Sequence, residues 1–148
     1  MLQVLHWLRK SVQEGNKKDK FLDLWVAFEF LTSGTSIPRL FQQTEISSLL
    51  QVVDKLELSN EQRRALHFRI SQLNEPPQMA IFNHLVKGVG VDFTDAELKV
   101  LSAARKKRTD IVHGKKDPEI KPEELDKMRT ILEKVLIKKL SALKLSAA

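Results

Sequence analysis

The sequence predicts an all-α fold, a single-domain helical bundle of about six or seven helices over residues 1–148. Apolar residues recur at intervals of three and four, and runs that alternate apolar with polar residues are almost absent. Five glycines and five prolines fit the same pattern, because a chain of many short strands needs more turns. A chain of 148 residues buries about 68–70% of its unfolded surface, so its core needs no disulfide or metal.

Helix starts and stops are marked along the chain by local signals. Ser59-Asn-Glu-Gln62 and Thr94-Asp-Ala-Glu97 have the spacing of capping boxes, which satisfy the free N–H groups at a helix start. Gly114 suits the position just past a helix end, and Pro122 suits the first turn of the next helix. The expected helices span about residues 2–14, 18–32, 41–57, 59–73, 77–87, 94–113 and 122–143. The apolar face of the third consists of Ile46, Leu49, Leu50, Val53 and Leu56.

The cysteine content and the apolar segments of the sequence indicate the cellular compartment. It has no cysteine, which excludes a disulfide framework and a thiolate metal site and suits a reducing cytoplasm. The segment Met1–Lys10 lacks the cationic start, apolar stretch and cleavage site of a signal peptide. The longest apolar run, Leu24–Leu31, is interrupted by Glu29 and is too short to span a bilayer. We therefore expect a soluble, cytoplasmic protein with no membrane contact.

The net charge is +6, and six of the 25 basic residues cluster around one histidine, His113. A basic surface attracts polyanions, which makes nucleic acid a reasonable partner, although a solvated lysine-rich face would have the same composition. The basic residues of the cluster are Arg105, Lys106, Lys107, Arg108, Lys115 and Lys116.

Two charged residues lie on helix faces that are otherwise apolar and are predicted to face the core. Arg108 lies inside an apolar arc of the sixth helix, and Glu29 lies within Phe21–Leu31, a segment that is apolar nearly all round. Burying an unpaired charge costs several kcal/mol, so we expect Glu29 and Arg108 to meet. Such a contact would also arise in a plain buried ion pair between two core helices. The arc consists of Val100, Leu101, Ala104, Ile111 and Val112.

His113 follows Arg108 by five residues, which places it about 140° round the helix and roughly 7.5 Å further along it. The two side chains converge only if the helix ends at Gly114 or if two copies of it pack together. Thr109 and Asp110 precede His113 by four and three residues, so either can orient its ring. A histidine here can also act simply as a favourable charge at a helix end.

The segment Arg108-Thr-Asp-Ile-Val-His113-Gly114 resembles the Arg-x4–6-His motif of the HEPN (higher eukaryotes and prokaryotes nucleotide-binding) superfamily. It is most similar to the Apea-like branch, where Arg-Asn-x-x-x-His-Gly is common. The resemblance covers about residues 18–140. Three further segments are similar to that branch: Lys20–Leu31, Leu73–Pro76 and Phe93–Leu98.

The resemblance implies a helical bundle that forms a homodimer, with two Arg/His motifs facing a shared cleft. Many members are metal-independent endoribonucleases, and others bind RNA, nucleotides or partner proteins. Arg108 and His113 match the two motif positions, whereas Thr109 departs from the usual Asn and loses its amide. The resemblance also suggests a toxin or defence effector, whose partner is an antitoxin or another protein domain.

These residue types suit RNA cleavage without a metal or other cofactor. RNA carries its own nucleophile, the 2′-hydroxyl, so a histidine to move protons and an arginine to face the phosphate suffice. No metal site is expected, because the other histidines lie on separate helices without ligand spacing. The expected phosphate contacts, which give affinity without sequence specificity, are Lys106, Lys107, Lys115 and Lys116.

The sequence thus predicts catalytic Arg108 and His113, with Glu29, Thr109 and Asp110 in supporting positions. The leading hypothesis is a homodimeric endoribonuclease. The first alternative is a module that binds RNA or a nucleotide without cleaving it. The second is a dimerisation or adaptor bundle, in which the contact between Glu29 and Arg108 serves only stability.

Overall fold

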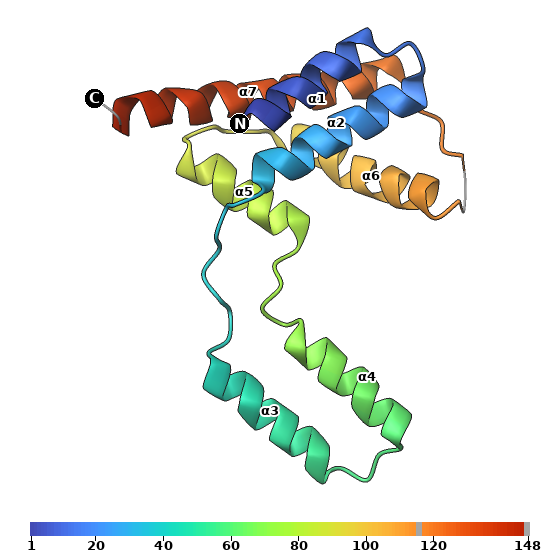
Figure 1. Cartoon of the computed structure of the whole chain (residues 1–148), viewed down its shortest axis with the longest axis vertical. Coiled ribbons are helices and arrows are strands. Elements are labelled where there is room, and N and C mark those ends of the chain that lie inside the picture. Colours follow the sequence, from blue (N-terminus) through green and yellow to red (C-terminus); the bar gives the residue numbers. More distant parts are fainter. Residues whose placement is uncertain (115–116, 147–148) are drawn as a thin grey trace. The chain divides into compact units, whose positions relative to one another are not determined.

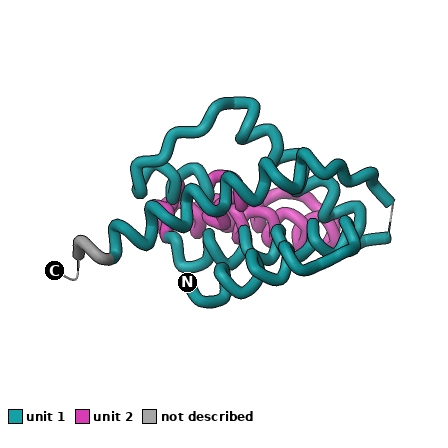
Figure 2. The backbone as a smooth tube through the Cα atoms, turned by 90° about the horizontal axis from the view of Figure 1, so that it is seen from above, with its two compact units in different colours: residues 1–35, 82–148 teal, residues 36–81 magenta. Residues whose placement is uncertain are grey.

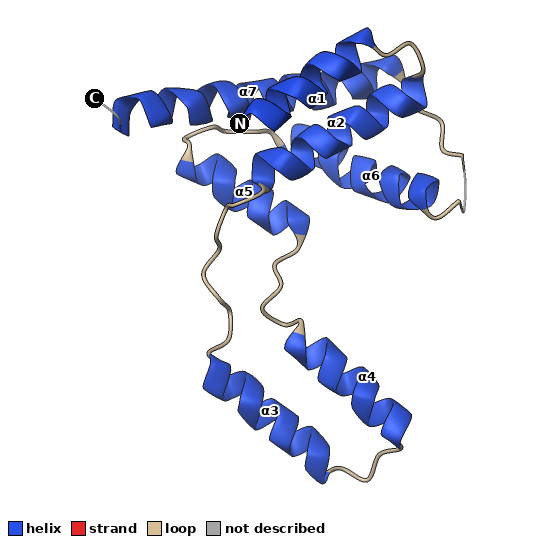
Figure 3. Cartoon of the chain, viewed as in Figure 1, coloured by secondary structure: helices blue, strands red, loops and turns tan. Residues whose placement is uncertain are grey.

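The computed structural model describes residues 1–114 and 117–146, and within these ranges it consists of helices and connecting loops without a strand (Figures 1 and 3). The predicted all-α fold class is therefore confirmed. Every predicted helix boundary lies within three residues of an observed one, because the caps and periodicity that mark them are local. The helices are α1 (Leu2–Gln13), α2 (Lys17–Thr32), α3 (Gln43–Lys55), α4 (Asn60–Ser71), α5 (Gln78–Gly88), α6 (Asp95–Val112) and α7 (Pro122–Ser146).

The helices gather into two compact units, which Figure 2 shows in different colours. The larger unit comprises residues 1–35 and 82–148, and the smaller unit comprises residues 36–81. Arg108, His113 and Glu29 all belong to the larger unit. A single domain over residues 1–148 stays a prediction.

The core of the larger unit is built around α2, which packs against α1, α6 and α7. Buried side chains occur on most sides of α2, as its nearly continuous apolar sequence predicted. Trp25 and Phe28 lie 5.0 Å apart between ring centroids, and Phe82 of α5 lies 5.4 Å from Phe28. The largest fully buried apolar side chains of this unit are Val4, Leu24, Phe28, Leu31, Phe82, Leu101, Met128, Ile131, Leu132 and Val135.

Two cations from neighbouring helices hold α2. Lys10 of α1 donates to Asp23, whose side chain is only 6% exposed, across 2.8 Å. This hydrogen bond raises the pKa of Lys10 against a smaller opposing effect of burial. Lys139 of α7 donates to the carbonyl oxygen of Leu31 at the other end of α2, across 3.1 Å, and burial lowers the pKa of Lys139. A cation at a helix C-terminus also opposes the negative end of the helix dipole.

The smaller unit is a hairpin of α3 and α4. The two helices are joined by a 2.8 Å contact between His67 and Asp54. Asn74 clamps the segment before α3, because its side-chain amide both accepts from and donates to the backbone of Phe41, at 3.0 and 2.9 Å. The predicted apolar face of α3 is buried only in part: Leu49 is 40% exposed and Leu56 is 47% exposed. In this unit α4 is the helix that packs on α3, and one helix cannot cover the whole face.

Both predicted capping boxes form. Ser59 and Gln62 exchange hydrogen bonds of 3.2 and 3.0 Å at the start of α4. Thr94 and Glu97 do so at 3.3 and 2.9 Å at the start of α6. These bonds satisfy N–H groups that have no partner inside the helix. The start of α6, and hence the placement of Arg108 along it, is therefore fixed by the sequence itself.

Gly114 adopts the left-handed backbone that ends many helices, with φ of +61°. A Cβ atom there would meet nothing within 4 Å, so an added methyl group would act through backbone strain alone. We predict that Gly114→Ala lowers the free energy of unfolding by about 1 kcal/mol. Gly15→Ala is the matched control, since Gly15 has equal space and no positive φ, and it should be neutral or slightly stabilising. Urea denaturation of both variants checks this, and equal losses would contradict it.

Candidate functional site

The two motif residues lie at the C-terminal end of α6. Arg108 is inside the helix, whereas His113 is its C-terminal capping residue and is exposed. The backbone stays helical up to this point. The backbone N–H groups of His113 and Gly114 donate to the carbonyl oxygens of Thr109 and Ile111, respectively, across 3.1 Å each. Arg108 and His113 therefore remain on different faces, about 140° apart. Within the part of the chain that the structure describes, no hydrogen bond or ion pair joins their side chains.

The predicted meeting of Glu29 and Arg108 is confirmed. The guanidinium Nη2 of Arg108 lies 3.6 Å from Oε1 of Glu29, so α6 and α2 share an ion pair. This distance is longer than the approximately 2.7–2.9 Å of a charge-assisted hydrogen bond. The same Oε1 atom accepts a hydrogen bond of 2.7 Å from the indole N–H of Trp25.

The expected burial of this pair is wrong. The side chains of Arg108 and Glu29 are 36% and 44% exposed. The helical wheel assumed that the whole of α6 faces the core, but its buried positions are Leu101 and Ala104. Further along, Val112 is 55% exposed, so the last turns of α6 extend past the core. Solvent therefore screens the pair, and the guanidinium stays accessible from one side.

The supporting positions beside His113 do not contact its ring. The hydroxyl of Thr109 donates to the carbonyl oxygen of Arg105 across 3.0 Å, a bond within its own helix. Among the described residues, the ring of His113 and the carboxylate of Asp110 make no hydrogen bond or ion pair. The orienting roles of Thr109 and Asp110 therefore stay predictions.

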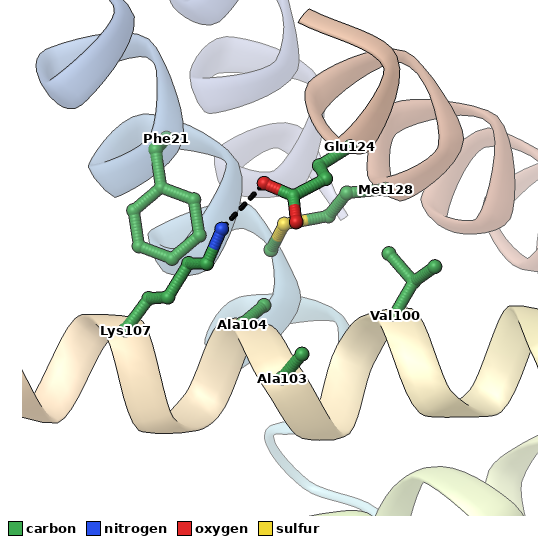
Figure 4. A pocket seen from close by; sticks show the side chains of 7 residues that line it. All are labelled: Phe21, Val100, Ala103, Ala104, Lys107, Glu124 and Met128. Atoms are coloured by element: carbon green, nitrogen blue, oxygen red, sulfur yellow. Dashed lines mark hydrogen bonds and ion pairs between the residues drawn. The ribbon is translucent and has the colours of Figure 1, made fainter. Parts of the chain in front are cut away.

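Lys107 points away from solvent toward α7. Its Nζ atom contacts the carboxylate of Glu124 at 2.5 Å (Figure 4). It also donates to the carbonyl oxygen of Glu119 across 2.7 Å. The side chain is 23% exposed, and its aliphatic part lies beside Phe21. The ammonium is thus neutralised within the chain, which favours a structural role over the predicted phosphate contact.

Lys106 is exposed on α6, as a phosphate contact requires. Lys115 and Lys116 lie outside the described residues. The phosphate-binding roles of these three lysines stay predictions.

The sequence interpretation missed two side chains, Trp25 and Glu124. Trp25 precedes Glu29 by four residues, and this spacing brings two side chains together on a helix. Glu124 could have been expected from Lys107, which follows Ala104 by three residues and so shares its core-facing side. An amine on that side needs a carboxylate, and the first turn of α7 supplies one.

The neighbourhood of Lys107 holds only a small cavity of about 10 Å³, lined by Phe21, Val100, Ala103, Ala104, Lys107, Glu124 and Met128 (Figure 4). This volume accommodates one water molecule at most, so the cavity is no substrate site. The described residues include no group of three or more His, Asp or Glu side chains that could hold a metal ion. Nor does any helix in the described ranges have the length and apolar character needed to cross a bilayer.

The pKa of Glu124 reflects its contact with Lys107. Burial raises the pKa of this carboxyl. Hydrogen bonds from the Lys107 ammonium and the Lys121 backbone N–H lower that pKa, as do the charges of both lysines, and together they outweigh the effect of burial. The net pKa in the folded protein is therefore below the ordinary 4.5. A lowered folded pKa means that the carboxylate stabilises the fold above its ordinary pKa and loses that effect in acid.

We therefore predict that Glu124→Gln lowers the free energy of unfolding by about 1 kcal/mol at neutral pH, a value moderated by partial exposure. The difference from the wild type should shrink as the pH falls below the ordinary 4.5 and through the lowered folded pKa. Denaturation measured across this pH range tests it. Glu123→Gln, also in the first turn of α7, is the matched control and should change little. A difference for Glu124→Gln that persists unchanged in acid would contradict this account.

Comparison of the chain with known protein families, with curated proteins and with solved structures found no match. The similarity to the HEPN superfamily rests on the sequence segments of this chain and stays a prediction. The contact between Glu29 and Arg108 holds independently of that similarity, because it is a feature of the structure itself.

Proposed function

We propose that this chain acts on RNA, as a metal-independent endoribonuclease that uses Arg108 and His113 across the interface of a homodimer. The observation that carries the proposal is the state of Arg108. Its guanidinium is tethered 3.6 Å from Glu29, is 36% exposed and makes no other ion pair among the described residues. A positioned arginine with free donors suits a phosphate group, whose oxygens match the planar guanidinium fork. His113 lies exposed at the end of the same helix.

The chemistry requires only these two kinds of side chain. Histidine titrates near neutral pH and can take the proton of the 2′-hydroxyl as it attacks the adjacent phosphorus. Arginine faces the negative charge that builds on the phosphate oxygens. The attack forms a 2′,3′-cyclic phosphate and breaks the bond to the 5′-oxygen of the next nucleotide. That oxygen takes up a proton from water, and the histidine returns the proton it removed to the solvent. Neither step needs a metal ion.

A second copy of the chain is required because Arg108 and His113 diverge within one helix. Where the C-terminal ends of two α6 helices pack together, the arginine of one copy can approach the histidine of the other. The surface at this end supports such packing. Val112 is 55% exposed and Ile111 is half-buried, so apolar area is available for a second copy to cover.

A second candidate function is RNA binding without cleavage. The hydroxyl of Thr109 is occupied by the carbonyl oxygen of Arg105, and no described side chain orients the His113 ring. Catalytic histidines depend on such orientation for the correct tautomer. Without it, Arg108 and Lys106 would still attract the RNA backbone.

Incubation of the protein with RNA in EDTA is predicted to yield fragments ending in 2′,3′-cyclic phosphate. His113→Ala and Arg108→Ala should each reduce the rate by about 100-fold or more. The matched controls are His84→Ala, an exposed histidine on α5, and Arg9→Ala, an exposed arginine on α1. Both controls should cleave at the wild-type rate. Gel electrophoresis and analysis of the fragment ends measure the outcome.

RNA that stays intact after prolonged incubation with the dimeric wild type would overturn the endoribonuclease. If that RNA still binds with a strong salt dependence, and His113→Ala leaves its affinity unchanged, the second candidate function is supported. If neither binding nor cleavage occurs, both functions on RNA are excluded.

A further inference from the structure

Trp25 is the residue that fixes Glu29. Trp25 is 4% exposed and its ring packs beside Phe28, so its orientation is set by the core. The indole N–H can only donate, and a buried indole needs a partner for it. Here it donates to Oε1 of Glu29 across 2.7 Å. The position of this carboxylate oxygen is therefore determined from the core side of α2.

The same oxygen faces Arg108 and falls short of a hydrogen bond with it. The distance from Oε1 to Nη2 of Arg108 is 3.6 Å, whereas a guanidinium hydrogen bond to a carboxylate spans about 2.7–2.9 Å. Both groups are partly exposed and carry flexible side chains, so packing alone does not prevent closer approach. The donor that already holds Oε1 is Trp25.

Arg108 is left with a nearby counter-charge and with unused donors. Across the ranges that the structure describes, its guanidinium donates no hydrogen bond. The Glu29 carboxylate offsets part of the free-energy cost of placing a cation at the edge of the core, yet it accepts no hydrogen bond from the guanidinium N–H groups. This combination suits a group that must be available to an incoming anion.

We propose that Trp25 is a positioning residue that holds Glu29 away from Arg108 and so keeps the guanidinium open to a phosphate group. The inference rests on the proposed function, in which Arg108 binds the RNA backbone. Without the indole N–H, Glu29 is released to close on Arg108. A phosphate must then displace a formed carboxylate hydrogen bond before it binds, and the affinity for RNA falls.

Fluorescence anisotropy with a labelled, 2′-O-methylated RNA oligonucleotide measures this affinity. The oligonucleotide lacks the attacking 2′-hydroxyl, so it stays intact during the measurement. Trp25→Phe retains a ring and removes only the donor, and it should weaken binding about two- to fivefold. Glu29→Gln removes the competing charge and should tighten binding by a similar factor. In the Glu29→Gln background, Trp25→Phe should then have no effect, because its action passes through Glu29. Trp7→Phe on α1 is the matched control and should bind as the wild type does.

The outcomes separate this inference from the proposed function. If Arg108→Ala binds the oligonucleotide as the wild type does, the proposed function fails. A different result overturns only the inference: Arg108→Ala loses binding, but Trp25→Phe weakens it equally in the wild-type and Glu29→Gln backgrounds. Trp25 would then act through packing.

A measurement that leaves Trp25 intact covers the case in which Trp25→Phe does not fold. In the Trp7→Phe protein, Trp25 supplies the single indole N–H resonance, since the chain contains two tryptophans. Glu29→Gln should shift this resonance upfield, because a neutral amide accepts a weaker hydrogen bond than a carboxylate. Addition of the oligonucleotide should also shift it as Arg108 engages phosphate. A resonance that responds to neither change overturns the inference.

Discussion

The structure depends on the burial of α2, because three other helices of the larger unit pack on it. Each of them also brings a cation to it: Lys10 of α1 to Asp23, Arg108 of α6 to Glu29, and Lys139 of α7 to the carbonyl oxygen of Leu31. These three contacts differ in accessibility. Lys10 meets a buried carboxylate and Lys139 is partly buried, whereas Arg108 meets a carboxylate that is 44% exposed. The contact of α6 is therefore the one whose acceptor is exposed, because Asp23 and Leu31 are both buried.

This difference follows from how far each helix extends past the core. The buried part of α6 ends near Ala104, one turn before Arg108. Lys107 lies on the side of α6 that faces α7, and its ammonium forms an ion pair with Glu124 that links the two helices. Arg108 lies on the side of α2, where a single carboxylate is shared with Trp25. Neighbouring cations on one helix thus serve separate purposes, one in packing and one in the proposed site.

Local features of the sequence predicted the helices well, and the candidate site only in part. The capping boxes at Ser59 and Thr94 depend on residues three apart, so their pattern is sufficient to locate α4 and α6. The contact between Glu29 and Arg108 was predictable because each charge interrupts an apolar face. Its exposure was not, because a helical wheel has no information on where the core ends along the axis. The sequence did not predict that one oxygen of Glu29 faces both Trp25 and Arg108. That arrangement depends on how three side chains from two helices are placed in space.

The central claim is that one chain supplies Arg108 and the other supplies His113 to a shared site. Mixing the two inactive variants tests it most directly, after denaturation and joint refolding so that mixed dimers form. In a dimer of Arg108→Ala with His113→Ala, one of the two sites contains both an intact arginine and an intact histidine. The account predicts that RNA cleavage returns in the mixture while each variant alone stays inactive. A mixture that contains mixed dimers and remains as inactive as its components would contradict it.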